Sequence, residues 1–226
     1  MSRPILHDYY RSSAAYRVRI ALGLKGVDYD HRIVNLAHGD QKLAAYHATN
    51  PHGFIPALEI DGLVLTQSLA ICDYLDAKYD PVPFVPGDPA ERAHVLALAL
   101  TVACDIHPLN NLRILKYLTG ELGVDEAAKD QWYRHWVIEG LTALEALAAP
   151  RAGRHLFGNA PSLADICLVP QLYNARRFAV PLDPYPTLCR ADETCAAIPA
   201  FAAAHPDRQG SHQSSTLMGA RQEQPE

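Results

Sequence analysis

Residues 10–22 read YRSSAAYRVRIAL, and this stretch decides how the first third of the chain is expected to fold. From Ser13 to Lys25 apolar residues recur at helical spacing, and Gly26 is placed to end that helix as a C-terminal cap. Residues 5–9 alternate weakly and predict a strand just before it. Two adjacent serines therefore lie where a strand passes into a helix, which puts hydroxyl groups at the helix N-terminus.

The next residues extend this pattern into a small mixed domain. Asp61-Gly62 is a strong two-residue turn signal and predicts a hairpin of residues 57–60 and 63–65. The remaining expected elements are a strand at 29–34, a short helix at 41–49 that Asn50-Pro51 ends, and a helix at 68–78. The predicted order is β-α-β-α-β-β-α.

A proline-rich segment follows and predicts a domain boundary. Prolines stand at positions 81, 83, 86 and 89, which is typical of a linker. Beyond it we expect one long helix from Ala90 to about Thr119, a second at 127–148, and a third that Ser162 and Asp165 open as a capping box. The predicted domains are residues 1–80 and 90–205, with a linker at 81–89 and a frayed polar tail at 206–226.

Bulk properties exclude several classes of protein. The net charge of −5 argues against a nucleic-acid binder that neutralises phosphates. No apolar run approaches the ~20 residues of a membrane span, and the N-terminus is too polar for a signal peptide. The five cysteines form no C-x-x-C pair, which favours a reducing, cytoplasmic location. The scattered histidines form no metal-ligand spacing, and the sequence contains neither a glycine-rich phosphate loop nor a nucleophile elbow.

A small mixed domain followed by a helical one resembles the glutathione transferases, and specifically their zeta class, the maleylacetoacetate and maleylpyruvate isomerases. The blocks that carry this resemblance are RSS (11–13) with RVRIAL (17–22), NP (50–51), IPAL (55–58), QSLAI (67–71), IHPLNNLRIL (106–115), SLAD (162–165), LVPQ (168–171) and ARRF (175–178). The resemblance implies a thioredoxin-like N-terminal domain, an all-helical C-terminal domain, glutathione as cofactor, a small diketo diacid as substrate and a homodimer.

The chain departs from this family at one position. The zeta motif usually has Ser-Ser-Cys after the arginine, and the bacterial maleylpyruvate enzymes have a threonine at the third place, whereas this chain has Ala14. Stabilisation of a thiolate must therefore come from Ser12, Ser13 and the backbone. His107 with Asn110-Asn111 looks more like the maleylpyruvate enzymes.

The residues of the first domain suit a thiol tripeptide. A free thiol is mostly protonated at neutral pH, and a helix N-terminus with hydroxyl donors lowers its pKa. Ser12 and Ser13 are placed for this, and one of them, more readily Ser13, is also expected to cap the helix. Ile55-Pro56 is a candidate cis bond, where the resemblance implies that Ile55 pairs with the cysteinyl backbone.

The expected glutathione site has further residues, which are His52, Gln67 and Ser68 of the first domain and Asp105, His107 and Asn111 of the second. Gln67 and Ser68 start a helix, whose N–H groups suit the γ-glutamyl carboxylate. His52 either reaches the glycyl carboxylate or is a solvated loop residue.

Arginines would hold the two carboxylates of the substrate, because a guanidinium binds a carboxylate with two parallel hydrogen bonds. Arg11 and Arg177 are the preferred candidates, whereas Arg113 and Arg176 are at least as well explained by surface ion pairs. His107 and Asn111 are four residues apart and should share a helix face, where they could hydrogen-bond an enolate. Asp105 is expected to orient the site or the glutathione amine.

The resemblance implies addition of the glutathione thiolate to a cis double bond, rotation, and elimination to the trans isomer. Two alternatives stay open. One is a general conjugating transferase or an α-haloacid dehalogenase, and the other is a glutathione-binding protein without turnover. The sequence does not distinguish maleylpyruvate from maleylacetoacetate.

Overall fold

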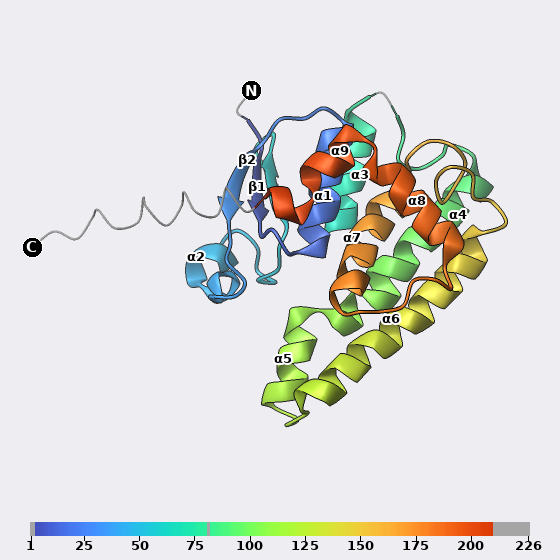
Figure 1. Cartoon of the computed structure of the whole chain (residues 1–226). Coiled ribbons are helices and arrows are strands. Elements are labelled where there is room, and N and C mark those ends of the chain that lie inside the picture. The colour runs from blue at the N-terminus through green and yellow to red at the C-terminus, as the bar shows by residue number, and fades with distance from the viewer. Residues whose placement is uncertain (1–2, 81, 210–226) are drawn as a thin grey trace, which may run out of the picture. The chain divides into compact units, whose positions relative to one another are not determined.

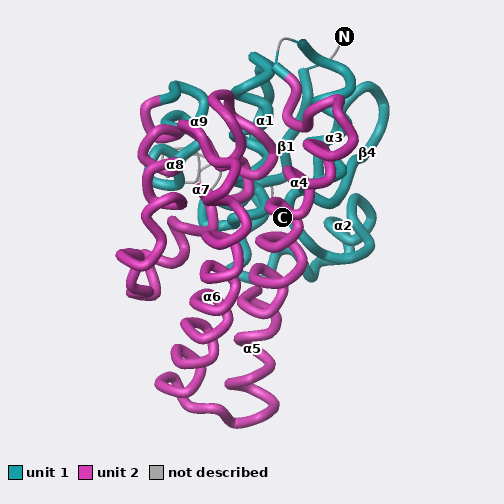
Figure 2. The backbone as a smooth tube through the Cα atoms, turned by 90° about the vertical axis from the view of Figure 1, so that its right-hand side faces the viewer, with its two compact units in different colours: residues 1–82, 198–226 teal, residues 83–197 magenta. Residues whose placement is uncertain are grey.

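A computed structural model describes residues 3–80 and 82–209. The chain divides into two compact units, Met1–Val82 with Ile198–Glu226, and Pro83–Ala197 (Figure 2). We call them unit 1 and unit 2. The expected helical domain ran to residue 205, whereas the structure groups the chain from Ile198 onward with the N-terminal part. The frayed tail expected at 206–226 instead starts with a 3-10 turn (Pro206–Arg208), and its remainder, 210–226, lies outside the described residues.

Unit 1 contains a four-stranded mixed sheet in the order β2-β1-β3-β4 (Figure 1). The strands are β1 (Ile5–Asp8), β2 (Asp30–Ile33), β3 (Ala57–Ile60) and β4 (Leu63–Thr66). β1 runs parallel to β2 and antiparallel to β3, with Leu6 opposite Leu58, and β3 pairs antiparallel with β4. Asp61 and Gly62 both have positive φ, at 55° and 78°, as a two-residue hairpin turn requires. The predicted hairpin is confirmed.

Helices α1 (Ser13–Leu24) and α3 (Ser68–Lys78) pack against each other in unit 1. Both match the predicted segments to within a residue. The predicted helix at 41–49 is instead a 3-10 turn (Asp40–Lys42) followed by the short α2 (Ala44–His47). The side chains that the sheet and these helices bury completely include Leu6, Ile20, Leu22, Leu58, Ile71 and Leu75.

A buried ion pair joins the C-terminal segment to the sheet of unit 1. Arg19 on α1 donates from Nη1 to Asp8 Oδ1 at 2.7 Å and from Nε to the carbonyl of Ala204 at 3.0 Å. Ala204 ends α9 (Pro199–Ala204), whose Ala200 lies so close to Gly23 of α1 that a Cβ at position 23 would be 3.1 Å from Ala200 Cβ. These contacts explain why the chain from Ile198 belongs with unit 1.

Unit 2 is helical. Its helices are α4 (Pro89–Leu100), α5 (Leu112–Gly120), α6 (Glu126–Ala148), α7 (Leu163–Arg177) and α8 (Pro186–Ala196). The predicted capping box at the start of α7 is present. The Asp165 carboxylate accepts from Ser162 N at 2.9 Å, from Ser162 Oγ at 2.8 Å, and from Leu156 N at 3.0 Å. One buried carboxylate therefore caps α7 and also holds the preceding loop.

The prediction of one long helix from Ala90 to Thr119 is wrong. After α4 the chain forms a π-helical segment (Thr101–Ile106) and a 3-10 turn (Pro108–Asn110), and α5 starts only after an extended Asn111. Pro108 cannot donate an N–H to the helix. The wide turn brings Ile106 against α6 at Gly140, where a Cβ would lie 2.2 Å from Ile106 Cγ1. Only glycine leaves room for this arrangement.

The same interrupted stretch, Pro89–Gly120, is the one part of the described chain that is long and apolar enough to cross a membrane by length and composition. No such run was expected from the sequence. The π segment, the 3-10 turn and the extended Asn111 break its helical hydrogen bonding. The stretch is therefore not one continuous α-helix, and a single segment of this length and composition is weak evidence for a membrane span.

Replacing Asp165 by alanine should lower the free energy of unfolding by about 3 kcal/mol or more, because several buried donors lose their acceptor together. The matched control is Asp125→Ala. Asp125 caps α6 from an exposed position through Ala128 N at 2.8 Å, so its loss should cost about 1 kcal/mol. Urea unfolding measures both variants. Equal losses would contradict the role given to the buried carboxylate.

Candidate active site

The start of α1 presents the two serines. Ser12 is the N-cap, and its Oγ accepts from Ala15 N at 3.2 Å. Ser13 is the first helical residue and is buried. The expectation that Ser13 is the more ready cap is therefore wrong, because the chain turns one residue earlier. Capping uses only a lone pair of the Ser12 oxygen, so its O–H stays available to donate to an anion.

Arg11 precedes this cap and is exposed, with its guanidinium carbon 4.9 Å from the centroid of the Tyr10 ring. A cation over an aromatic face is held without being neutralised. The first turn of α1 thus combines a hydroxyl donor, the positive end of the helix dipole and a full positive charge. This arrangement favours an anion.

The loop before β3 contains the predicted cis bond, between Ile55 and Pro56. Tyr46 Oη and Asn50 Nδ2 both donate to the carbonyl of Phe54 at 2.7 Å and hold the loop. Within the described residues the N–H and C=O of Ile55 make no hydrogen bond. They are therefore open to the backbone of a peptide ligand, as expected.

His52 lies in the same loop with an exposed side chain. Its N–H donates to Asn50 Oδ1 at 3.1 Å, and its ring packs 5.6 Å from the ring of Phe54. The position is compatible both with binding of the glycyl carboxylate and with a solvated loop residue.

Gln67 and Ser68 form the start of α3. Gln67 has φ 66° and ψ 114°, a conformation that non-glycine residues rarely adopt and that is concentrated at functional sites. Ser68 is buried, and its Oγ accepts from Arg17 Nη1 at 3.2 Å. Arg17 was not predicted from the sequence as a site residue. The available signal was a charged residue within the buried pattern of α1.

Unit 2 brings His107 and Asn111 together, although no continuous helix joins them. Asn111 Nδ2 lies 3.5 Å from His107 Nε2, and Asn111 Oδ1 accepts from Arg113 N at 3.1 Å to cap α5. Asp105 is exposed on the π segment. Both polar atoms of the Asn110 side chain are buried without a hydrogen-bond partner among the described residues. This cluster therefore combines several side chains that can hydrogen-bond a ligand.

The two arginines at the end of α7 differ in whether they have a carboxylate partner. Arg176 Nη2 pairs with Asp192 Oδ2 at 2.6 Å, so it already has a carboxylate partner within unit 2. Arg177 is exposed, and its one hydrogen bond within the described chain is to the neutral Asn174 Oδ1, at 3.5 Å, with Tyr173 and Phe178 beside its guanidinium. Arg113 is also exposed. The structure thus distinguishes Arg177 as the better anchor for an external carboxylate.

One turn of α6 holds both of these regions of unit 2. Trp132 Nε1 donates to the carbonyl of Leu109 at 2.8 Å, and Arg134 Nε donates to that of Phe178 at 2.9 Å. Tyr133, between them, stacks on Phe178 at 3.5 Å between ring centroids. The polar cluster that follows the π segment and the end of α7 are therefore fixed by the same rigid element.

One buried cluster in unit 2 has side chains that could bind a metal, namely His155, Asp165 and Cys195. His155 Nδ1 is 3.5 Å from both Asp165 Oδ1 and Cys195 Sγ. The carboxylate, however, is already occupied by the capping of α7, and burial raises the pKa of the Cys195 thiol well above its usual range. The cluster is better explained by hydrogen bonding. The expectation that the protein has no metal stays a prediction.

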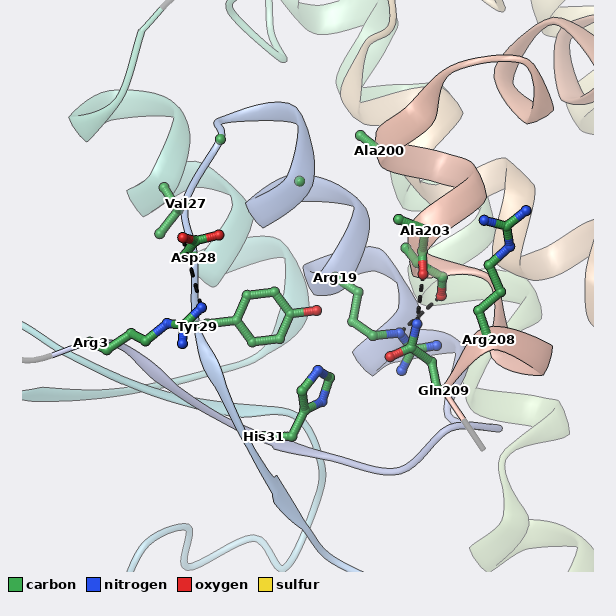
Figure 3. A pocket seen from close by; sticks show the side chains of 13 residues that line it. Arg3, Arg19, Val27, Asp28, Tyr29, His31, Ala200, Ala203, Arg208 and Gln209 are labelled. Carbon is green, nitrogen blue, oxygen red and sulfur yellow. Dashed lines mark hydrogen bonds and ion pairs between the residues drawn. The ribbon is translucent and has the colours of Figure 1, made fainter. Parts of the chain in front are cut away.

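Unit 1 also contains a hollow of about 380 Å³ at the C-terminal end of α1, away from the serines (Figure 3). Tyr29 and His31 point into it, and burial raises the pKa of Tyr29 to about 12. The charges around it are largely compensated. Arg3 pairs with Asp28 and Asp30, and Arg19 pairs with Asp8. Its chemistry therefore indicates no ligand class.

The fold and the unit 1 site together define a class of protein, a thioredoxin-like domain joined to a helical domain. Comparison with protein families supports this class. The model of the glutathione S-transferase N-terminal domain matches residues 6–83, and that of the C-terminal domain matches residues 126–203. A probable maleylacetoacetate isomerase of Vibrio cholerae is 51% identical over 208 residues, covering 91% of this chain and 96% of that protein.

Two solved structures are similar throughout. A holo maleylpyruvate isomerase, described as a bacterial zeta-class glutathione transferase, has a TM-score of 0.89 at 44% identity, covering 91% of this chain and 98% of its own. A maleylacetoacetate isomerase of Methylobacterium extorquens with bound malonate and glutathione has a TM-score of 0.89 at 40% identity, covering 92% and 98%. The chain belongs to the glutathione S-transferase family, in its zeta class.

The strained backbone of Gln67 gives a prediction. Gln67→Gly should be about 1 kcal/mol more stable to unfolding than Gln67→Ala, because glycine relieves the positive φ whereas alanine keeps it. Both variants remove the same exposed side chain, so their difference isolates the backbone. An ordinary exposed position would give the opposite order, since glycine usually costs about 0.5–1 kcal/mol. Urea unfolding measures the difference.

Proposed function

We propose that this protein is a glutathione-dependent cis–trans isomerase that converts maleylacetoacetate or maleylpyruvate to the fumaryl isomer. The observation that carries the proposal is near full-length similarity to proteins of those names, at 44–51% identity. The unit 1 site supports it, because the hydroxyl at the start of α1, the open backbone of Ile55 and the start of α3 suit the thiol, the cysteinyl backbone and the γ-glutamyl group of the tripeptide.

The thiol, the cysteinyl backbone and the γ-glutamyl carboxylate of glutathione each have a proposed partner in unit 1. The thiolate lies at the start of α1, where Ser12 O–H donates to the sulfur and the helix dipole lowers the thiol pKa. Ser13 and the backbone N–H groups of the first turn assist, because Ala14 provides neither thiol nor hydroxyl. Ile55 and Pro56 meet the cysteinyl segment, and Gln67 and Ser68 bind the γ-glutamyl carboxylate.

Isomerisation then follows from reversible addition. The thiolate sulfur attacks one alkene carbon of the cis diketo acid and forms a carbon–sulfur bond, and the electron pair of the double bond moves onto the adjacent keto oxygen as an enolate. The bond that was double can now rotate. Collapse of the enolate re-forms the alkene as the trans isomer, breaks the carbon–sulfur bond and returns the thiolate. Glutathione is therefore not consumed.

The enolate and the carboxylates require hydrogen-bond donors. From the resemblance to the family, we assign the substrate carboxylates to Arg11 and Arg177, and stabilisation of the enolate oxygen to His107 with Asn111. Asp105 is proposed to orient the glutathione amine. The ion pair of Arg176 with Asp192 supports a structural role for Arg176, and Arg113 stays a secondary candidate.

The cellular setting is part of the same proposal. The substrates place the enzyme in the breakdown of aromatic compounds. The five cysteines all lie within the described residues and are free, which supports a reducing cytoplasm. A homodimer is expected from the family. It is supported by Leu63 and Val64, which are about half exposed on the edge strand β4.

The test follows substrate and thiol together. With catalytic glutathione, the cis diketo acid should convert completely to its trans isomer while total free thiol stays constant. A conjugating transferase would consume one thiol per turnover, and a dehalogenase would release halide only from an α-halo acid. Glutathione binding without any change in the diketo acid would contradict the proposal and indicate a binding protein.

Arg177→Ala should raise the KM for the diketo acid by on the order of tenfold or more, because a charge-assisted carboxylate contact is lost. The KM for glutathione should change little. Arg176→Ala is the matched control from the same helix turn, and it should lower thermal stability more than it changes either KM. Equal effects of Arg177→Ala on both KM values would remove Arg177 from the substrate site.

A further inference from the structure

Two arginines of α1 are buried, and they differ in the hydrogen-bond partners that surround their guanidinium groups. Arg19 is 1% exposed, and each of its guanidinium nitrogens donates to an oxygen, among them the carboxylate of Asp8. Arg17 is 2% exposed, yet only its Nη1 has a partner, the neutral Ser68 Oγ at 3.2 Å. Its Nε and Nη2 are buried without a hydrogen-bond partner in the described part of the chain.

This arrangement is costly unless an anion is added. A guanidinium stays charged at any accessible pH, and burying it without a counter-ion costs several kcal/mol. The described residues give Arg17 a hydroxyl oxygen and no carboxylate. The positive charge of Arg17 is therefore uncompensated among the described residues, and its one hydrogen-bond partner belongs to Ser68, the first residue of α3.

The start of α3 is where an anion would enter. Ser68 is the first residue of an eleven-residue helix whose N-terminal N–H groups have no partner within the helix. Gln67, just before it, is held in a strained conformation with φ 66°. Given the proposed function, the anion at this point is the α-carboxylate of the γ-glutamyl residue.

The buried nitrogens of Arg17 indicate that it acts through Ser68 without touching the ligand. The guanidinium donates to a lone pair of Ser68 Oγ, which leaves the hydroxyl proton free to point toward a carboxylate. A hydroxyl that accepts from a cation also becomes a stronger donor, since linked hydrogen bonds polarise one another. The positive charge adds an attraction that the low-polarity interior screens weakly.

We infer that Arg17 is a positioning residue that selects, through Ser68, the α-carboxylate of the γ-glutamyl group of the thiol cofactor. This inference rests on the proposed function. It predicts that Arg17 contributes to the affinity for glutathione but not to the affinity for a tripeptide thiol that lacks this one carboxylate, such as γ-aminobutyryl-cysteinyl-glycine.

Titration calorimetry with both ligands tests the inference on the full chain. Wild type should prefer glutathione to the decarboxylated analogue. Arg17→Met should weaken glutathione binding by about tenfold and leave the analogue unchanged, and Arg17→Lys should recover part of the loss. In a Ser68→Ala background, Arg17→Met should have little further effect, because the connecting hydroxyl is gone. Arg208→Met, an exposed arginine of unit 1, is the charge-matched control and should keep the wild-type preference.

The outcomes separate the two proposals. If wild type binds no glutathione, the proposed function fails and the inference fails with it. If wild type prefers glutathione and the Arg17 variants keep that preference, or lose affinity for both ligands equally, the inference alone is overturned. If Arg17→Met does not fold, Arg17→Lys still tests the inference, because its partial recovery predicts a preference for glutathione that is weaker than that of wild type, and an undiminished preference would overturn the inference.

Discussion

The backbone N–H groups at the starts of α1 and α3 are the constraint on which unit 1 depends. Each helix begins with about four N–H groups that have no partner within the helix. At α1 the side chain of Ser12 satisfies only one of them, through Ala15, and at α3 the preceding Gln67 provides no side-chain cap. The start of a helix, where such N–H groups point outward, attracts anions. The site is thus a consequence of how the two helices start, and Arg11 and Arg17 add full charges to these partial ones.

The structure uses buried arginines for two different purposes. Arg19 stabilises the fold, because its contacts with Asp8 and Ala204 join the sheet, α1 and the returning C-terminal helix. Arg17, two residues earlier on the same helix, has one neutral partner and leaves the local charge uncompensated. A buried positive charge that has no counter-ion in the free protein is stabilised when a ligand supplies the missing negative charge. Binding and stability are therefore coupled at Ser68.

Local signals in the sequence predicted much of this fold. The Asp61-Gly62 turn, the helices at 13–25 and 68–78, the cis bond before Pro56 and the Ser162–Asp165 capping box each depend on residues close together in the chain. The break after Leu100 was missed because it depends on Gly140, which lies on another helix and leaves room for Ile106. The return of α9 to unit 1 depends on Arg19 meeting Ala204, a contact 185 residues apart.

In the candidate site, too, some features depend on residues close together in the chain and others on contacts between distant residues. The serines, the arginine beside them and the Gln67-Ser68 pair were predicted from spacing and resemblance. The contact of Arg17 with Ser68 spans 51 residues, and no periodicity shows which buried arginine has a carboxylate partner and which does not. The sequence pattern also favoured Ser13 as the N-cap of α1, one residue later than the observed cap, Ser12. His107 and Asn111 meet as expected, but through a broken helix and not along a continuous face.

We expect the start of α1 to stabilise the thiolate of bound glutathione. An ultraviolet titration of bound glutathione, which follows thiolate absorbance against pH, measures this directly. The expected thiol pKa is well below the ordinary value of about 8.5, so that most bound glutathione is ionised at neutral pH. Glutathione that binds but ionises only at its free-solution pKa would contradict it.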